Sequence, residues 1–109
     1  MKPFDLHMLA NTSGKLRAKA CTPEVMVVNG VSYAQGVCGF AWVVFAGNTS
    51  FGKYMLECGL ASKRYGSPGL SMWISEYGQS YEKKRAYAQG YASVLQAHGL
   101  KSHSGSRMD

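Results

Sequence analysis

The chain contains few groups that could carry out acid–base or nucleophilic chemistry. It has six carboxylates, three histidines and three cysteines among 109 residues. No two of them stand at the spacing of a catalytic motif, and neither a P-loop nor a GxGxxG pattern is present. Groups distant in sequence could still converge in space, with His98, Cys58 and Glu57 as the strongest candidates. We therefore expect no catalytic residues, and a binding protein rather than an enzyme.

The cysteines indicate neither a metal site nor a disulfide framework. Cys21, Cys38 and Cys58 are odd in number and far apart, and no His/Cys pair has metal-ligand spacing. The uncharged stretch over residues 25–52 is interrupted by polar side chains, and its clean apolar run over 37–47 is too short to cross a bilayer. We expect no metal, no cofactor, no membrane association and a cytoplasmic location.

The residues best suited to contact a ligand lie in an aromatic stretch, residues 38–45, with the sequence Cys-Gly-Phe-Ala-Trp-Val-Val-Phe. After its first residue this stretch resembles the RNP1 signature of RNA-recognition motif domains. In that family alternate aromatic rings stand on the open face of a sheet, and unpaired bases stack on them. The resemblance implies binding of RNA or single-stranded DNA through Phe40, Trp42 and Phe45. Cys38 replaces the basic residue of the family, and an ordinary buried strand is the alternative interpretation.

Basic residues near tyrosines form a second binding signal. One group lies in a Gly-Pro loop and the other in the first turns of an expected helix: Lys63, Arg64, Lys83, Lys84 and Arg85. Tyr87 should share the exposed face of Lys83 and Lys84. Lysine and arginine neutralise phosphates while tyrosine stacks on bases, and the net charge of +6 favours anionic partners. The alternative is a solvated helix face whose tyrosines pack on the core.

Length and composition indicate a single domain over residues 1–109, with loose ends near 1–14 and 103–109. The expected fold class is α+β: an antiparallel-dominated sheet of four or five strands with two helices on one face. Over residues 15–20 apolar and basic side chains alternate, which is typical of a strand with one solvent-exposed face, although a helix is also possible there. Asn29-Gly30 between two apolar runs predicts a β-hairpin.

The second half of the chain is expected to contain two strand–helix units. Strands are predicted at 39–45 and 70–74, and helices at 51–58 and 81–98. Asn48, Thr49 or Ser50 would cap the first helix and Ser80 the second. From residue 101 the chain should begin a short edge strand and then fray.

The two units also resemble each other. Trp42 and Gly47 recur as Trp73 and Gly78 at an offset of 31, and Phe51 recurs as Tyr81 at an offset of 30. The recurrence indicates either an internal repeat or the chance similarity of any two strand–helix units.

Taken whole, the chain resembles a class of small, uncharacterised bacteriophage and prophage proteins. The resemblance rests on three stretches, at residues 48–52, 73–80 and 105–109. It implies a phage origin and a host-cytoplasm setting, and it supplies no catalytic or binding residues. Proteins of this class commonly bind nucleic acid or a host protein. We therefore expect nucleic acid as the partner, with a host polymerase, nuclease or defence complex as the alternative.

Overall fold

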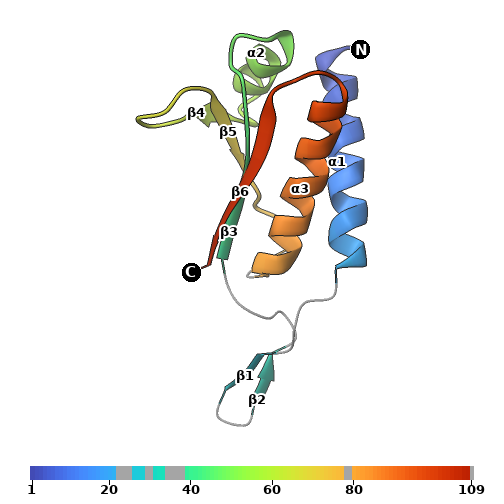
Figure 1. Cartoon of the computed structure of the whole chain (residues 1–109), viewed down its shortest axis with the longest axis vertical. Helices are drawn as coiled ribbons and strands as arrows, with labels where there is room; N and C mark the ends of the chain where they lie inside the picture. Colours follow the sequence, from blue (N-terminus) through green and yellow to red (C-terminus); the bar gives the residue numbers. More distant parts are fainter. Residues whose placement is uncertain (22–25, 29–30, 34–38, 78–79, 109) are drawn as a thin grey trace.

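The fold is α+β, as expected, and is built on a four-stranded antiparallel sheet with the strand order β4-β5-β3-β6 (Figure 1). The structure is a computed structural model and describes residues 1–21, 26–28, 31–33, 39–77 and 80–108. The strands are β1 (Met26–Val28), β2 (Val31–Tyr33), β3 (Gly39–Phe45), β4 (Ser62–Lys63), β5 (Leu70–Trp73) and β6 (Ser102–Met108). The helices are α1 (Pro3–Ala20), α2 (Ser50–Glu57) and α3 (Tyr81–Ala97).

The N-terminal segment is a helix, so the prediction of a loose start over residues 1–14 was wrong. Residues 15–20 adopt the helical alternative and not the strand. The buried positions of α1 are Leu6, Ala10, Gly14 and Ala18, a spacing of four that places them on one side of the helix. This side packs against α3, where a Cβ on Gly14 would lie only 2.8 Å from the ring of Tyr87. Small residues thus let two helix backbones approach closely, and the contact stabilises a helix of weak amphipathicity.

The remaining helix boundaries follow the expected caps. The hydroxyl of Thr49 accepts a hydrogen bond from the Gly52 amide at 2.9 Å, and that of Ser80 accepts one from the Lys83 amide at 3.3 Å. Gly59 and Gly99 follow the two helices with φ of 72° and 84°, which favours glycine because it has no Cβ to clash.

Two strand predictions have different outcomes. β1 and β2 pair in antiparallel fashion, which confirms the hairpin, although the turn residues 29–30 lie outside the described residues. The C-terminal segment was expected to begin a short edge strand and then fray, but β6 pairs with β3 along its whole length, from Phe45↔Ser102 to Gly39↔Met108. It is therefore a full edge strand up to residue 108.

Both long helices lie on the same side of the sheet (Figure 1). α3 packs directly on β3 and β6, and α1 packs on α3 as a second layer. Val43, Phe45, Tyr91 and Leu95 fill the core between α3 and the sheet. No helix in the described part of the chain is long and apolar enough to cross a membrane. We call the opposite face of the sheet the open face. It carries the side chains that alternate along each strand with those of the core.

Candidate nucleic-acid interface

The open face is defined by the alternation of β3 and by the strands paired with it. Ala41, Val43 and Phe45 are buried on the helix side, so Phe40, Trp42 and Val44 point to the other side. Residues directly opposite one another in an antiparallel pair share a face. Their partners therefore lie on the open face as well: Trp73 and Ser71 of β5, and Arg107, Gly105 and His103 of β6.

Three aromatic rings meet on this face, and we call Phe40, Trp42 and Trp73 the aromatic cluster. The ring centroids of Trp42 and Trp73 lie 4.8 Å apart at an interplanar angle of 40°. Phe40 meets Trp73 edge-on with centroids 6.1 Å apart. Phe40 is 37% exposed and Trp73 is 52% exposed. Such large rings are ordinarily buried, and their grouping leaves an accessible aromatic surface.

Two cations lie against the cluster. The guanidinium carbon of Arg107 is 5.6 Å from the centroid of the Phe40 ring, and the ammonium of Lys84 is 5.8 Å from it. Arg107 is exposed, whereas Lys84 is buried and donates a hydrogen bond to the carbonyl of Gly39 at 3.4 Å. Arg107 therefore combines a contact with the aromatic cluster and a positive charge available to a ligand.

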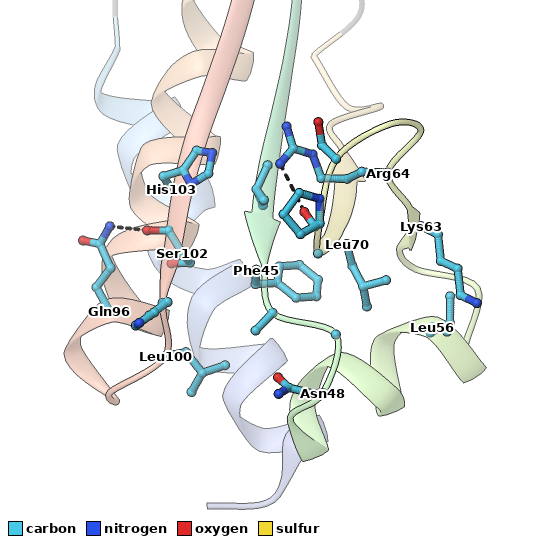
Figure 2. Close-up of a pocket in the computed structure, with 17 residues that line it drawn as sticks. Phe45, Asn48, Leu56, Lys63, Arg64, Leu70, Gln96, Leu100, Ser102 and His103 are labelled. Atoms are coloured by element: carbon cyan, nitrogen blue, oxygen red, sulfur yellow. Dashed lines mark hydrogen bonds between the residues drawn. The ribbon is translucent and has the colours of Figure 1, made fainter.

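A large pocket opens at the far end of the same sheet, where β3 ends, and we call it the basic pocket (Figure 2). Its volume is about 1010 Å³. One wall comes from the β4–β5 connection and the other from the segment joining α3 to β6. Four basic side chains line it, namely Lys63, Arg64, Lys101 and His103, and none of the described lining residues is acidic. The lining also includes the apolar side chains of Val44, Phe45, Leu56, Leu70 and Leu100.

The structure divides the residues predicted to bind. Phe40 and Trp42 lie together on the open face, and Lys63 and Arg64 lie in the basic pocket. Phe45 is only 2% exposed because it points to the helix side, where its ring packs against Phe51 at 5.1 Å. The prediction that Phe45 is a stacking platform was therefore wrong, because Phe45 lies on the opposite face of the strand from Phe40 and Trp42.

The predicted basic helix face is also corrected. Tyr87 is 3% exposed, because it points to α1, where its hydroxyl donates a hydrogen bond to Asn11. Lys84 is buried as described above, so neither is an exposed contact. Lys83 is half-buried and Arg85 exposed, but both belong to α3, on the side of the sheet away from the aromatic cluster.

Four residues of the site were not predicted: Trp73, Lys101, His103 and Arg107. The recurrence of Trp42 as Trp73 was the one available signal, since the two tryptophans turn out to be direct cross-strand partners. The β6 residues lie in a segment that was expected to be loose. Its seven pairs with β3 could not be read from the segment's own polar composition.

A second, smaller cavity of about 310 Å³ lies near α1 and contains His7 and Glu76. The Nδ1 atom of His7 lies 2.7 Å from the hydroxyl oxygen of Tyr91, which fixes the imidazole ring. Burial lowers the pKa of His7, and the nearby Glu76 carboxylate partly opposes this shift. Among the described residues, no three His, Cys, Asp or Glu side chains are grouped as metal ligands.

Comparison with known proteins found no matching family model, no matching curated protein and no matching solved structure.

Proposed function

We propose that the protein binds single-stranded nucleic acid, RNA or single-stranded DNA, on the open face of its sheet. The observation that carries the proposal is the aromatic cluster: three rings side by side, two of them more than a third exposed, with Arg107 against one of them. Aromatic side chains on a sheet are the standard platform for unpaired bases.

Single strands fit this surface better than a duplex. The bases of a duplex are already stacked on one another, so their faces are closed to a protein side chain. Stacking on an aromatic ring contributes about 1–3 kcal/mol per base and does not depend strongly on base identity. We therefore expect binding with little sequence preference.

The charges around the open face support the same partner. Arg107 lies at the aromatic end, while Lys63, Arg64 and Lys101 lie at the other end around the basic pocket. A single-stranded nucleic acid that runs along β3 would pass from Arg107 to the basic pocket, with its phosphates near positive charge at both ends. Each phosphate neutralised should contribute about 0.7 to the salt dependence of binding by a single strand.

The experiment is an anisotropy titration of fluorescein-labelled oligouridylate and oligothymidylate, alongside a duplex of equal length. Trp73→Ala should weaken single-strand binding by about five- to 150-fold, the equivalent of one lost stacking contact. Phe4→Ala is the matched control, because Phe4 is a 54% exposed aromatic residue on α1, away from this face. Lys83→Ala should leave the salt slope unchanged, whereas Lys101→Ala should reduce it.

Equal affinity of the wild-type protein and the Trp73→Ala variant for every single strand would rule out the open face as the binding surface. Tighter binding to the duplex than to the single strands would rule out stacking on the cluster.

A protein partner is the second proposed function, and a different observation favours it. Helix α1 leaves four large apolar side chains exposed, at Phe4, Met8, Leu9 and Leu16. Such residues are common at protein interfaces when they gather on one element. If the chain is of phage origin, the partner is a host protein. A protein retained from nuclease-treated host extract by the wild type, and lost with Leu9→Glu but not with Trp73→Ala, would support this function.

A further inference from the structure

The basic pocket has the chemistry of a site for one nucleotide. Its floor is apolar and is formed by Val44, Phe45 and Leu70, which are nearly fully buried. Its rim carries the four basic side chains, with no acidic residue among the described residues that line it. A nucleotide has a matching division, with an apolar base face at one end and an anionic phosphate at the other. Ligand sites commonly combine an apolar lining with a few convergent polar groups.

Arg64 is held in place to meet an anion. Its Nη1 donates a hydrogen bond to the carbonyl of Pro68 at 3.3 Å, within the same β4–β5 connection. This contact uses one of the five N–H donors of the guanidinium group, so the others are available to a phosphate. Figure 2 shows Arg64 and His103 on either side of β3, with Phe45 at the end of that strand and Leu70 on the same side as Arg64.

The opposite wall is also fixed. Gln96 of α3 donates a hydrogen bond to the carbonyl of Ser102 at 2.7 Å, and the Ser102 hydroxyl donates one to the carbonyl of Ala92 at 3.0 Å. These contacts tie the start of β6 to α3. They thereby hold Lys101 and His103, the neighbours of Ser102, at the pocket edge.

The pocket lies around the end of β3, and its open-face members Val44 and His103 adjoin the aromatic cluster. Val44 pairs with His103 in the sheet, and Trp42 pairs with Gly105 two residues away. Two residues of strand span roughly 7 Å, so the pocket begins about that far from the tryptophan. A single-stranded nucleic acid whose bases stack on the aromatic cluster can therefore place its next nucleotide in the basic pocket while it stays in contact with the sheet.

We propose that the basic pocket binds one nucleotide, with its phosphate at the basic side chains of Lys63, Arg64, Lys101 and His103 and its base against Val44 of the open face. The proposal rests on the proposed function in that this nucleotide belongs to the strand stacked on the aromatic cluster. A free mononucleotide offers the same chemistry and is distinguished by the experiment.

The experiment uses the full chain and compares three probes: AMP, adenosine and a short oligoadenylate. Binding is followed by NMR shifts of the Val44 methyl groups and by calorimetry. AMP should bind about tenfold or more tightly than adenosine, because hydrogen bonds to a charged group are stronger than those to a neutral one. A double Lys63→Ala, Lys101→Ala variant should lose this preference, while Lys83→Ala, Arg85→Ala is the charge-matched control. All four positions are outside the buried core.

The oligoadenylate separates the two sources of the nucleotide. If the strand supplies it, the pocket variant weakens oligoadenylate binding about tenfold, and Trp73→Ala weakens it independently. If a free nucleotide is the ligand, the pocket variant loses AMP and binds oligoadenylate as the wild type does. That second result would overturn the link to the strand and keep the nucleotide site.

Two outcomes distinguish failure of this inference from failure of the proposed function. Equal binding of AMP and adenosine, with Trp73→Ala still weakening oligoadenylate binding, would overturn the pocket site alone. Oligoadenylate affinity unchanged by Trp73→Ala, with AMP still shifting the Val44 methyl groups, would overturn the proposed function alone.

Discussion

The indole ring of Trp42 occupies the space that a side chain at Gly105 would fill. A Cβ built on Gly105 would overlap both Cε2 and Nε1 of the Trp42 indole ring. The two residues are direct cross-strand partners in β3 and β6. Glycine at this position lets the indole lie against the neighbouring strand, where it meets Trp73 and completes the aromatic cluster.

Gly105→Ala should therefore displace the Trp42 ring. We expect a red shift of tryptophan emission, weaker single-strand binding and a loss of unfolding free energy of about 1–3 kcal/mol from overpacking. Emission spectra, anisotropy titration and urea unfolding measure the three effects. Ser104→Ala, at the adjacent position of β6, should change none of them appreciably. Unchanged emission and affinity in the Gly105→Ala variant would contradict this role of the Trp42–Gly105 contact.

Gly14→Ala should destabilise the packing of α1 on α3. The added Cβ would lie 2.8 Å from the Tyr87 ring and 2.9 Å from the Tyr87 carbonyl oxygen, which is backbone and cannot rotate away. We expect a loss of about 1–3 kcal/mol in unfolding free energy, measured by urea denaturation, although alanine favours helix more than glycine does. Lys15→Ala, at the exposed next position, should have little effect. An increase in stability in Gly14→Ala would mean that the two helices do not approach this closely.

The sequence allows prediction of those elements whose signals are local. Thr49 and Ser80 could be identified as caps because each side chain accepts a hydrogen bond from a backbone amide three residues ahead, in the first turn of its helix. Helix α1 was missed because its burial is set by contact with α3 through Ala10, Gly14 and Ala18, and its own apolar pattern is weak. Small residues at a spacing of four give little hydrophobic signal, although they allow the closest helix packing.

The site was predicted only in part for a related physical reason. A strand has two faces, and residue types alone do not say which face a helix will cover. Phe40 and Trp42 could therefore be proposed, but Phe45 was wrongly placed with them. Trp73 and Arg107 join them through β5 and β6, which lie far along the chain, and this register is fixed only by the folded sheet.

Stability should decrease in mildly acidic solution because of His7. Burial lowers its pKa from the ordinary value of 6.5, so the unfolded chain binds the proton more readily than the folded protein. The contribution of His7 to the free energy of unfolding is therefore complete above about pH 6.5, the pKa of the unfolded chain. This contribution is lost as the pH falls from about 6.5 through the lower pKa of the folded protein.

His7→Gln removes the titrating group and should flatten this part of the pH profile, measured by urea unfolding between about pH 5 and 8. Met8→Gln, at an exposed neighbouring position of α1, should retain the wild-type slope. A slope in His7→Gln as steep as in the wild type would assign the acid sensitivity to another group.

Intrinsic tryptophan fluorescence gives the most direct test of base stacking on the open face. The chain has two tryptophans, and both belong to the aromatic cluster, so all tryptophan emission reports on this one surface. Saturation with oligouridylate should quench the emission of the wild-type protein strongly, with the same midpoint as the anisotropy titration, because stacked bases contact the indole rings. Binding seen by anisotropy with unchanged tryptophan emission would contradict the account, since the strand would then lie somewhere other than on Trp42 and Trp73.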